Sequence, residues 1–190
     1  MLPLFGFVFL GLFSPGPNVI LLTTSGARFG FLATVPHILG VALGVGVIAG
    51  ITGFGIGSLL LAAPGLTLFL KIIACLWILT MAIRLWRSDP AARGTSGRPF
   101  TFAEAVLFQW VNPKIWAVAL SATAYVTDLP PTEQAVTLAT TFSALNLGVC
   151  LFWTGTGSSL RNLLTNPTAW RVFMRSMALG LAAFSVLVFL

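Results

Sequence analysis

A long apolar run at the start of the chain is broken near its middle by two prolines and a glycine. The run begins at Leu2 and continues past Leu22, and the interruption reads Ser14-Pro15-Gly16-Pro17-Asn18. Because proline has no N–H, the carbonyls of Gly11 and Phe13 lose their helical donors. Inside a bilayer such a break is tolerated only where it is buried in protein or lines a cavity. The motif therefore predicts a broken transmembrane helix of the kind that forms substrate sites in secondary transporters.

A second break, Asn112-Pro113-Lys114, interrupts a later apolar run that extends from Phe102 to Val126. Asparagine favours the N-cap of a helix and proline its first turn, so a new helix is expected to begin here, and Ser14-Pro15 is interpreted in the same way. Each break lies about a dozen residues into its run, or roughly 18 Å at about 1.5 Å per residue. That depth is near the middle of a hydrocarbon core about 30 Å thick. The matched depths favour a shared site, and two proline kinks without function are the alternative.

The composition restricts the protein to one class. Hydrophobic residues make up 57% of the sequence and charged residues 7%, which is typical of a polytopic membrane protein. The net charge of +6 does not indicate a nucleic-acid partner, because the basic residues flank apolar spans. With one histidine and four acidic residues, no triad, metal cluster or carboxylate pair can be assembled. We therefore expect no enzyme activity, no cofactor and no metal site, and we expect Cys75 and Cys150 to be small buried hydrophobes.

The apolar segments predict an all-α fold with six transmembrane spans. These spans are about Leu2–Ser25, Ala33–Leu61, Leu66–Trp86, Phe100–Val126, Thr132–Ser158 and Arg171–Leu190. All eight arginines then fall on one side of the membrane, namely Arg28, Arg84, Arg87, Arg93, Arg98, Arg161, Arg171 and Arg175. The positive-inside rule places that side in the cytoplasm, so both termini are expected outside.

The six spans divide into two groups of three within a single membrane domain. Residues 1–87 are interpreted as the first repeat, 88–99 as a cytoplasmic linker and 100–190 as the second repeat. Three spans per repeat give the two repeats opposite orientations, which is an inverted-topology repeat whose first and fourth helices are broken. The second span carries six glycines at small-xxx-small spacings, Gly40, Gly44, Gly46, Gly50, Gly53 and Gly57. This spacing permits close helix packing, either within the protomer or at the seam of a homodimer.

Several motifs resemble the LysE/RhtB family of amino-acid exporters. They are Phe13-Ser14-Pro15-Gly16-Pro17-Asn18, Ser25-Gly26-Ala27-Arg28-Phe29-Gly30, His37-Ile38-Leu39-Gly40 and Gln109-Trp110-Val111-Asn112-Pro113-Lys114. The resemblance covers nearly the whole chain. It implies a multi-pass protein of the bacterial inner membrane that exports amino acids or close derivatives, driven by the proton-motive force. One departure is Val45-Gly46, which stands where many members carry an acidic residue.

We expect the two breaks to form the substrate site. Its residues are Ser14, Pro15, Gly16, Pro17, Asn18, Asn112, Pro113 and Lys114. A lysine deep in the membrane costs about 2.5–3.5 kcal/mol on insertion scales. A substrate carboxylate would offset that cost, and snorkelling or a backbone carbonyl partner is the alternative. The helix start after Ser14 or Gly16 offers a second place for an anion. The freed carbonyls of Gly11, Phe13 and Gln109 are expected to accept an ammonium group, so the site suits a small zwitterion.

Polar residues elsewhere in the spans are few. His37 is the only histidine, and since its charge changes near neutral pH it is a candidate carrier of a coupling proton, or equally a hydrogen-bonded packing residue. The run Thr137, Thr140, Thr141 and Asn146 is better explained by threonines bonding to their own helix. Glu104 is expected to be an interfacial acid close to Arg98. A passive small-solute channel and a non-transporting membrane scaffold remain the alternatives to an exporter.

Overall fold

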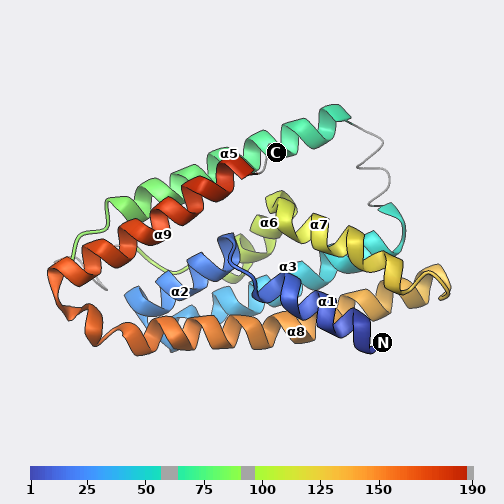
Figure 1. Ribbon diagram of the computed structural model, residues 1–190, viewed down its shortest axis with the longest axis horizontal. Helices are drawn as coiled ribbons and strands as arrows, with labels where there is room; N and C mark the ends of the chain where they lie inside the picture. Colours follow the sequence, from blue (N-terminus) through green and yellow to red (C-terminus); the bar gives the residue numbers. More distant parts are fainter. Residues whose placement is uncertain (57–63, 91–96, 188–190) are drawn as a thin grey trace.

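The described residues of the computed structural model, 1–56, 64–90 and 97–187, form helices and contain no strands (Figure 1). The long helices are α1 (Leu2–Phe13), α2 (Pro17–Phe29), α3 (Phe31–Gly53), α5 (Pro64–Trp86), α6 (Phe102–Val111), α7 (Pro113–Ala122), α8 (Pro131–Leu160) and α9 (Pro167–Leu187). Two short 3-10 helices, η1 (Thr123–Tyr125) and η2 (Leu163–Thr165), follow α7 and α8.

Four of these helices are long and apolar enough to cross a bilayer, namely α3, α5, α8 and α9. The pair α1 and α2 meets at an angle of 58° and counts as a fifth candidate if it forms one bent span. The fourth predicted span is divided between α6 and α7, which have 10 residues each and are too short to cross alone. The six-span inverted repeat therefore stays a prediction, whereas the structure shows an all-helical arrangement of the described residues with four or five helices long and apolar enough to cross a membrane.

Two predicted helix boundaries near the second span are wrong. The connection expected between the spans that end at Ser25 and begin at Ala33 is a single residue, because α2 continues to Phe29 and α3 begins at Phe31. Gly30 has φ +89°, a conformation that glycine adopts without the steric cost of a side chain. The second span was expected to reach Leu61, but α3 ends at Gly53, and Gly55 follows with φ +85°. Leu61 and Gly57 lie outside the described residues.

The glycines of α3 let it pack closely against two neighbours, α6 and α8. A Cβ atom on Gly40 would overlap the Phe102 carbonyl of α6, and one on Gly44 would lie 2.8 Å from Cγ of Gln109. Three further glycines, Gly46, Gly50 and Gly53, face Ser143, Ala139 and Ala135 of α8. The small-xxx-small face is thus used within the protomer, as in close packing of membrane helices generally.

Helix α2 crosses α8 with equally close backbone contact. A Cβ atom on Gly26 would overlap the Thr154 carbonyl, and one on Gly157 would overlap the Thr23 carbonyl. This crossing fixes the second half of α2 against the long α8. In Figure 1, α5 and α9 form a separate pair that lies along one side of the other helices.

The described arginines gather at one end of the molecule. Arg28, Arg84 and Arg98 line one cavity, and Arg87, Arg171 and Arg175 line a neighbouring depression. The Arg161 guanidinium lies beside Gly30, at the α2–α3 junction. In Figure 1 the α8–α9 connection and the end of α5 share the left-hand end, opposite the N-terminus. This grouping agrees with the one-sided arginine pattern in the sequence; Arg93 lies outside the described residues.

Candidate functional site

The first break is formed by the end of α1 and the start of α2. Ser14 ends α1, donating its N–H to the Leu10 carbonyl at 3.1 Å and its hydroxyl to the Gly11 carbonyl at 2.9 Å. Gly16 is fully extended, with φ −177° and ψ 180°, and α2 begins at Pro17. The prediction that Ser14-Pro15 starts the second helix is therefore wrong. A helix starting at Pro15 would need Gly16 in the α conformation directly before Pro17, which the proline ring disfavours.

The second break is formed by one residue, Asn112, between α6 and α7. Its backbone is extended, with φ −85° and ψ 100°, and Pro113 is the first residue of α7 as the sequence predicts. The Asn112 side chain does not cap α7; its amide donates to Gln109 Oε1 at 3.5 Å. The Asn112 N–H donates to the Gln109 carbonyl at 3.1 Å. The carbonyls of Gly11 and Gln109, both expected to be free for an ammonium group, therefore have partners already.

Lys114 joins the two breaks. Its ammonium group donates to the Ser14 carbonyl and, at 3.5 Å, to the Pro15 carbonyl. A Cβ atom on Gly16 would lie 2.9 Å from Cδ of Lys114, so a glycine at this position leaves room for the lysine stem. The backbone carbonyl partner left open by the sequence is thus the partner present in this structure.

A pair of amide side chains forms a second link between the breaks. The Asn18 amide donates to Gln109 Oε1 at 2.8 Å, and the Gln109 amide donates to Asn18 Oδ1 at 3.2 Å and to the Ala105 carbonyl at 2.9 Å. Gln109 is fully buried, so these bonds satisfy polar atoms that have no access to water. The pair ties α2 to α6.

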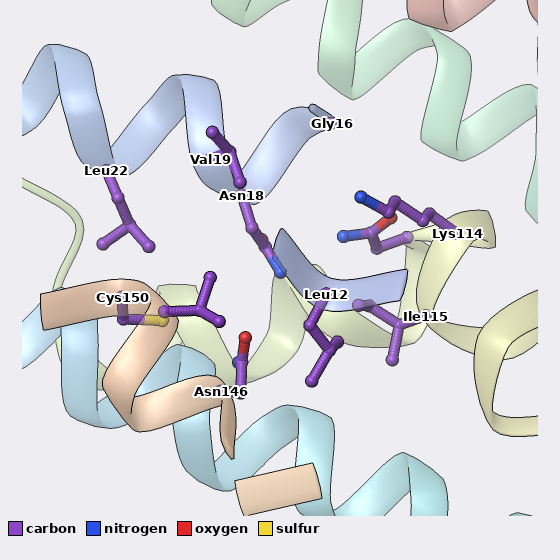
Figure 2. Close-up of a pocket in the computed structure, with 11 residues that line it drawn as sticks. Leu12, Gly16, Asn18, Val19, Leu22, Lys114, Ile115, Asn146 and Cys150 are labelled. Carbon is purple, nitrogen blue, oxygen red and sulfur yellow. The ribbon is translucent and has the colours of Figure 1, made fainter. Parts of the chain in front are cut away.

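Four polar side chains, Asn18, Asn112, Lys114 and Asn146, line a small cavity between the breaks and α8 (Figure 2). The other lining residues are Leu12, Gly16, Val19, Leu22, Ile115, Val149 and Cys150. In Figure 2, Asn18 and Asn146 point into the same space from α2 and α8. The cavity volume is about 10 Å³, room for about one water-sized sphere. Asn112 Oδ1 and Asn146 Nδ2 are buried and have no hydrogen-bond partner among the described residues.

Four of the eight predicted substrate-site residues line this cavity: Gly16, Asn18, Asn112 and Lys114. Ser14 and Pro15 contribute carbonyls to the Lys114 bridge, while Pro17 and Pro113 set the helix starts. Sequence reasoning missed the side chains of Gln109 and Asn146. From the sequence, Gln109 is assigned a role only through its carbonyl, although a glutamine three residues before a helix break in an apolar run is a usable signal. Asn146 stands in a run with threonines, of which Thr140 does bond to its own helix, at 2.7 Å from the Val136 carbonyl.

His37 lies away from the cavity between the breaks. It lines a second cavity, of about 90 Å³, at the arginine end of the molecule. Its side chain is 2% exposed, and its ring lies 5.0 Å from that of Phe100 between centroids. His37 therefore packs as a buried residue, but neither ring nitrogen has the expected hydrogen-bond partner among the described residues.

Other predicted features can be placed as well. Glu104 accepts two hydrogen bonds from the Arg98 guanidinium, at 2.6 and 2.7 Å, which confirms the expected proximity. Both cysteines are free thiols, with Cys150 buried and Cys75 partly buried. Within the described part of the chain, no group of three or more His, Cys, Asp or Glu side chains is placed to hold a metal ion.

Comparison with known protein families gives a match over most of the chain. The family described as LysE type translocator matches residues 9–190, which is nearly the whole chain. Neither the comparison with curated proteins nor the comparison with solved structures gives a match.

Proposed function

The chain belongs to the LysE type translocator family, and from that premise we propose that it exports amino acids or close derivatives, driven by the proton-motive force. Members of this family are transporters that move solutes out across a membrane, and they are not enzymes. The observation that carries the proposal is the Lys114 bridge, which places an ammonium group of one helix break on backbone carbonyls of the other.

A zwitterion would be bound by exchange at this bridge. A carboxylate is a stronger acceptor for a lysine ammonium group than a neutral carbonyl, because both partners are then charged. The substrate carboxylate would therefore take Lys114 from the carbonyls of Ser14 and Pro15. Those two carbonyls would then accept the substrate ammonium group. The internal bridge from Lys114 to these carbonyls is replaced by contacts from both groups to the substrate, and the carbonyls differ from those that the sequence suggested.

Substrate binding by this exchange also removes the Lys114 bridge that joins the two breaks, so the helices on either side of it can move apart. The present cavity has no room for an amino acid, so the helices around it must move before substrate enters. On the arginine side the Asn18–Gln109 pair closes the path between α2 and α6. On the opposite side α1 meets α7, where a Cβ atom on Gly11 would lie 2.8 Å from Cγ1 of Val118. Opening these two contacts in turn would expose one fixed site to each side, as in alternating access.

The remaining parts of the proposal follow from charge and topology. The arginine end faces the cytoplasm of a bacterium, in accord with the positive-inside rule, and both termini lie outside the inner membrane. Protons are the coupling ion, and His37 is the candidate carrier. Assembly into a homodimer would use a surface other than the described α3 glycines, since these pack against α6 and α8.

The test is transport by the purified protein in liposomes. A panel of radiolabelled amino acids is assayed for uptake under an imposed pH gradient and for counterflow without one. An exporter accumulates its substrate against a gradient when protons are supplied, and Lys114→Met abolishes that flux while Lys71→Met, the other lysine of the chain, retains it. Flux that follows the substrate gradient and ignores the proton gradient would show a passive channel. No flux for any solute would favour a scaffold.

A further inference from the structure

The cavity at the arginine end has the properties of a second binding site. It is lined by α2, α3, α5 and the segment that leads into α6, and its polar wall includes Ser25, Arg28, His37, Arg84 and Arg98. Its volume of about 90 Å³ is larger than that of the cavity between the breaks. Among the described residues that line it, none is acidic. The Arg98 guanidinium is bonded to Glu104, so the three guanidinium groups around this space leave an excess of positive charge beyond that ion pair. This excess favours an anionic ligand such as a carboxylate.

The buried histidine gives an independent reason to expect a ligand here. His37 lines the cavity, is 2% exposed and leaves both ring nitrogens without a hydrogen-bond partner among the described residues. Buried polar atoms are nearly always paired, so an imidazole beside a cavity with no partner among the described residues indicates room for a ligand as its partner. One turn earlier Thr34 bonds to Ser25, at 2.9 Å, so the neighbouring hydroxyls are already satisfied.

Helix α2 connects this cavity to the site between the breaks. Asn18 and Leu22 line the cavity between the breaks, while Ser25 and Arg28, further along the same helix, line the cavity at the arginine end. The Asn18–Gln109 pair ties this helix to α6 beside the first of the two cavities. A solute entering from the arginine end would meet the guanidinium groups before it met Lys114.

We propose that the cavity lined by Arg28, Arg84, Arg98 and His37 is a loading subsite that binds the carboxylate of the substrate ahead of the Lys114 site. This inference rests on the proposed export function. It also names the substrate class: solutes with a carboxylate and a net charge of zero or below. A cationic side chain finds no free carboxylate on these walls, since Glu104 nearby is bonded to Arg98. The subsite therefore selects against lysine and arginine.

Substitution of Glu104 gives a test in which an anionic ligand should bind more tightly than it does to the wild type. Glu104→Gln removes the negative charge beside Arg98, while the new amide oxygen can still accept the Thr101 N–H that Glu104 accepts now at 2.8 Å. Arg84→Gln removes one positive charge from the cavity. Arg87→Gln is the matched control, because Arg87 lies three residues further along the chain, just after the end of α5, and lines the neighbouring depression instead. Arg84→Lys tests whether a positive charge at this position is enough to bind the carboxylate without the planar guanidinium group.

The measurement is equilibrium dialysis of the purified full-length protein in detergent, with L-glutamate and L-lysine as probes. Glutamate is expected to bind more tightly than lysine. Its affinity should rise in Glu104→Gln and fall in Arg84→Gln, each by up to about fivefold, as for a solvent-accessible charge pair. Arg87→Gln should bind like the wild type. Equal affinities for the two probes, or glutamate affinities unchanged in both variants, would overturn the subsite. If Arg84→Gln fails to fold, the Glu104→Gln variant alone decides: a higher affinity for glutamate supports the subsite, and an unchanged or lower affinity overturns it.

Transport assays separate this inference from the proposed function. Export with an intact Lys114 dependence, together with unchanged glutamate binding in Glu104→Gln and Arg84→Gln, would leave the exporter and remove the loading subsite. The expected binding pattern without any transport would leave an anion site and remove the exporter.

Discussion

Replacing Lys114 by methionine tests the bridge between the two helix breaks. Methionine keeps an unbranched stem beside Gly16 and removes the ammonium donor, so packing is largely preserved. The contact to the Pro15 carbonyl, at 3.5 Å, is at the limit of a hydrogen bond and contributes little. The bond to the Ser14 carbonyl is charge-assisted, and such bonds contribute about 1.5–3 kcal/mol. Because Lys114 is only partly buried, we expect a loss of about 1.5 kcal/mol in the free energy of unfolding.

The assay is thermal and denaturant unfolding of the purified protein in detergent. Lys71→Met is the matched control, because this lysine lies on α5 and lines a different, apolar cavity together with Pro113 and Trp116. A substrate that binds by the proposed exchange should stabilise the wild type and fail to stabilise Lys114→Met. The loss of binding is expected to be about 2–5 kcal/mol, the cost of leaving a desolvated charge without its partner.

Two results would refute this reasoning. If Lys114→Met unfolds with the same free energy as Lys71→Met, the bridge to Ser14 does not stabilise the structure. If Lys114→Met is still stabilised by the substrate of the wild type, the carboxylate is bound elsewhere.

Three further predictions concern the amide pair, coupling and topology. Asn18→Ala and Gln109→Ala should each cost about 1–3 kcal/mol of stability by leaving a buried amide unpaired, and a double-mutant cycle should show coupling; additive losses would contradict the pair. His37→Gln should abolish proton-driven export while counterflow continues, and export that still responds to the pH gradient would exclude this residue from coupling. A single cysteine at Ser88 should be shielded from impermeant thiol reagents in intact cells while one at Thr132 is labelled, and the reverse pattern would invert the proposed orientation.

The positions of the two breaks could be predicted because proline acts locally. Pro113 lacks an N–H and prefers a first helical turn whatever surrounds it, and α7 begins there. At the first motif two prolines compete, and the rule for the residue before a proline decides between them. Applying that rule to Gly16 would have placed the helix start at Pro17 from sequence alone.

The partners of the polar side chains could not be predicted in the same way. Gln109 and Asn18 are far apart in sequence, and their pairing depends on how α6 packs against α3 and how α2 crosses α8. The glycine spacing indicated that α3 packs closely, yet it could not say whether the neighbour was α6, α8 or a second copy. Asn146 likewise reaches the cavity only because α8 passes beneath both breaks.

The second break acts by changing the direction of the chain, and not by leaving backbone carbonyls without hydrogen bonds. The sequence suggested that Pro113 leaves the Gln109 carbonyl free for a ligand, but the Asn112 N–H already occupies it. What the break changes is the course of the chain, since the extended Asn112 separates α6 from α7 and places Lys114 in the first turn of a new helix. From there its ammonium group reaches the carbonyls of Ser14 and Pro15. In a continuous helix the five residues from Gln109 to Lys114 would fix the two side chains roughly 140° apart around one axis. The extended Asn112 removes that constraint, so the direction of Lys114 no longer depends on the direction of Gln109. Two broken helices therefore let one small cavity collect amides, carbonyls and a single positive charge, which are the groups that a zwitterion requires.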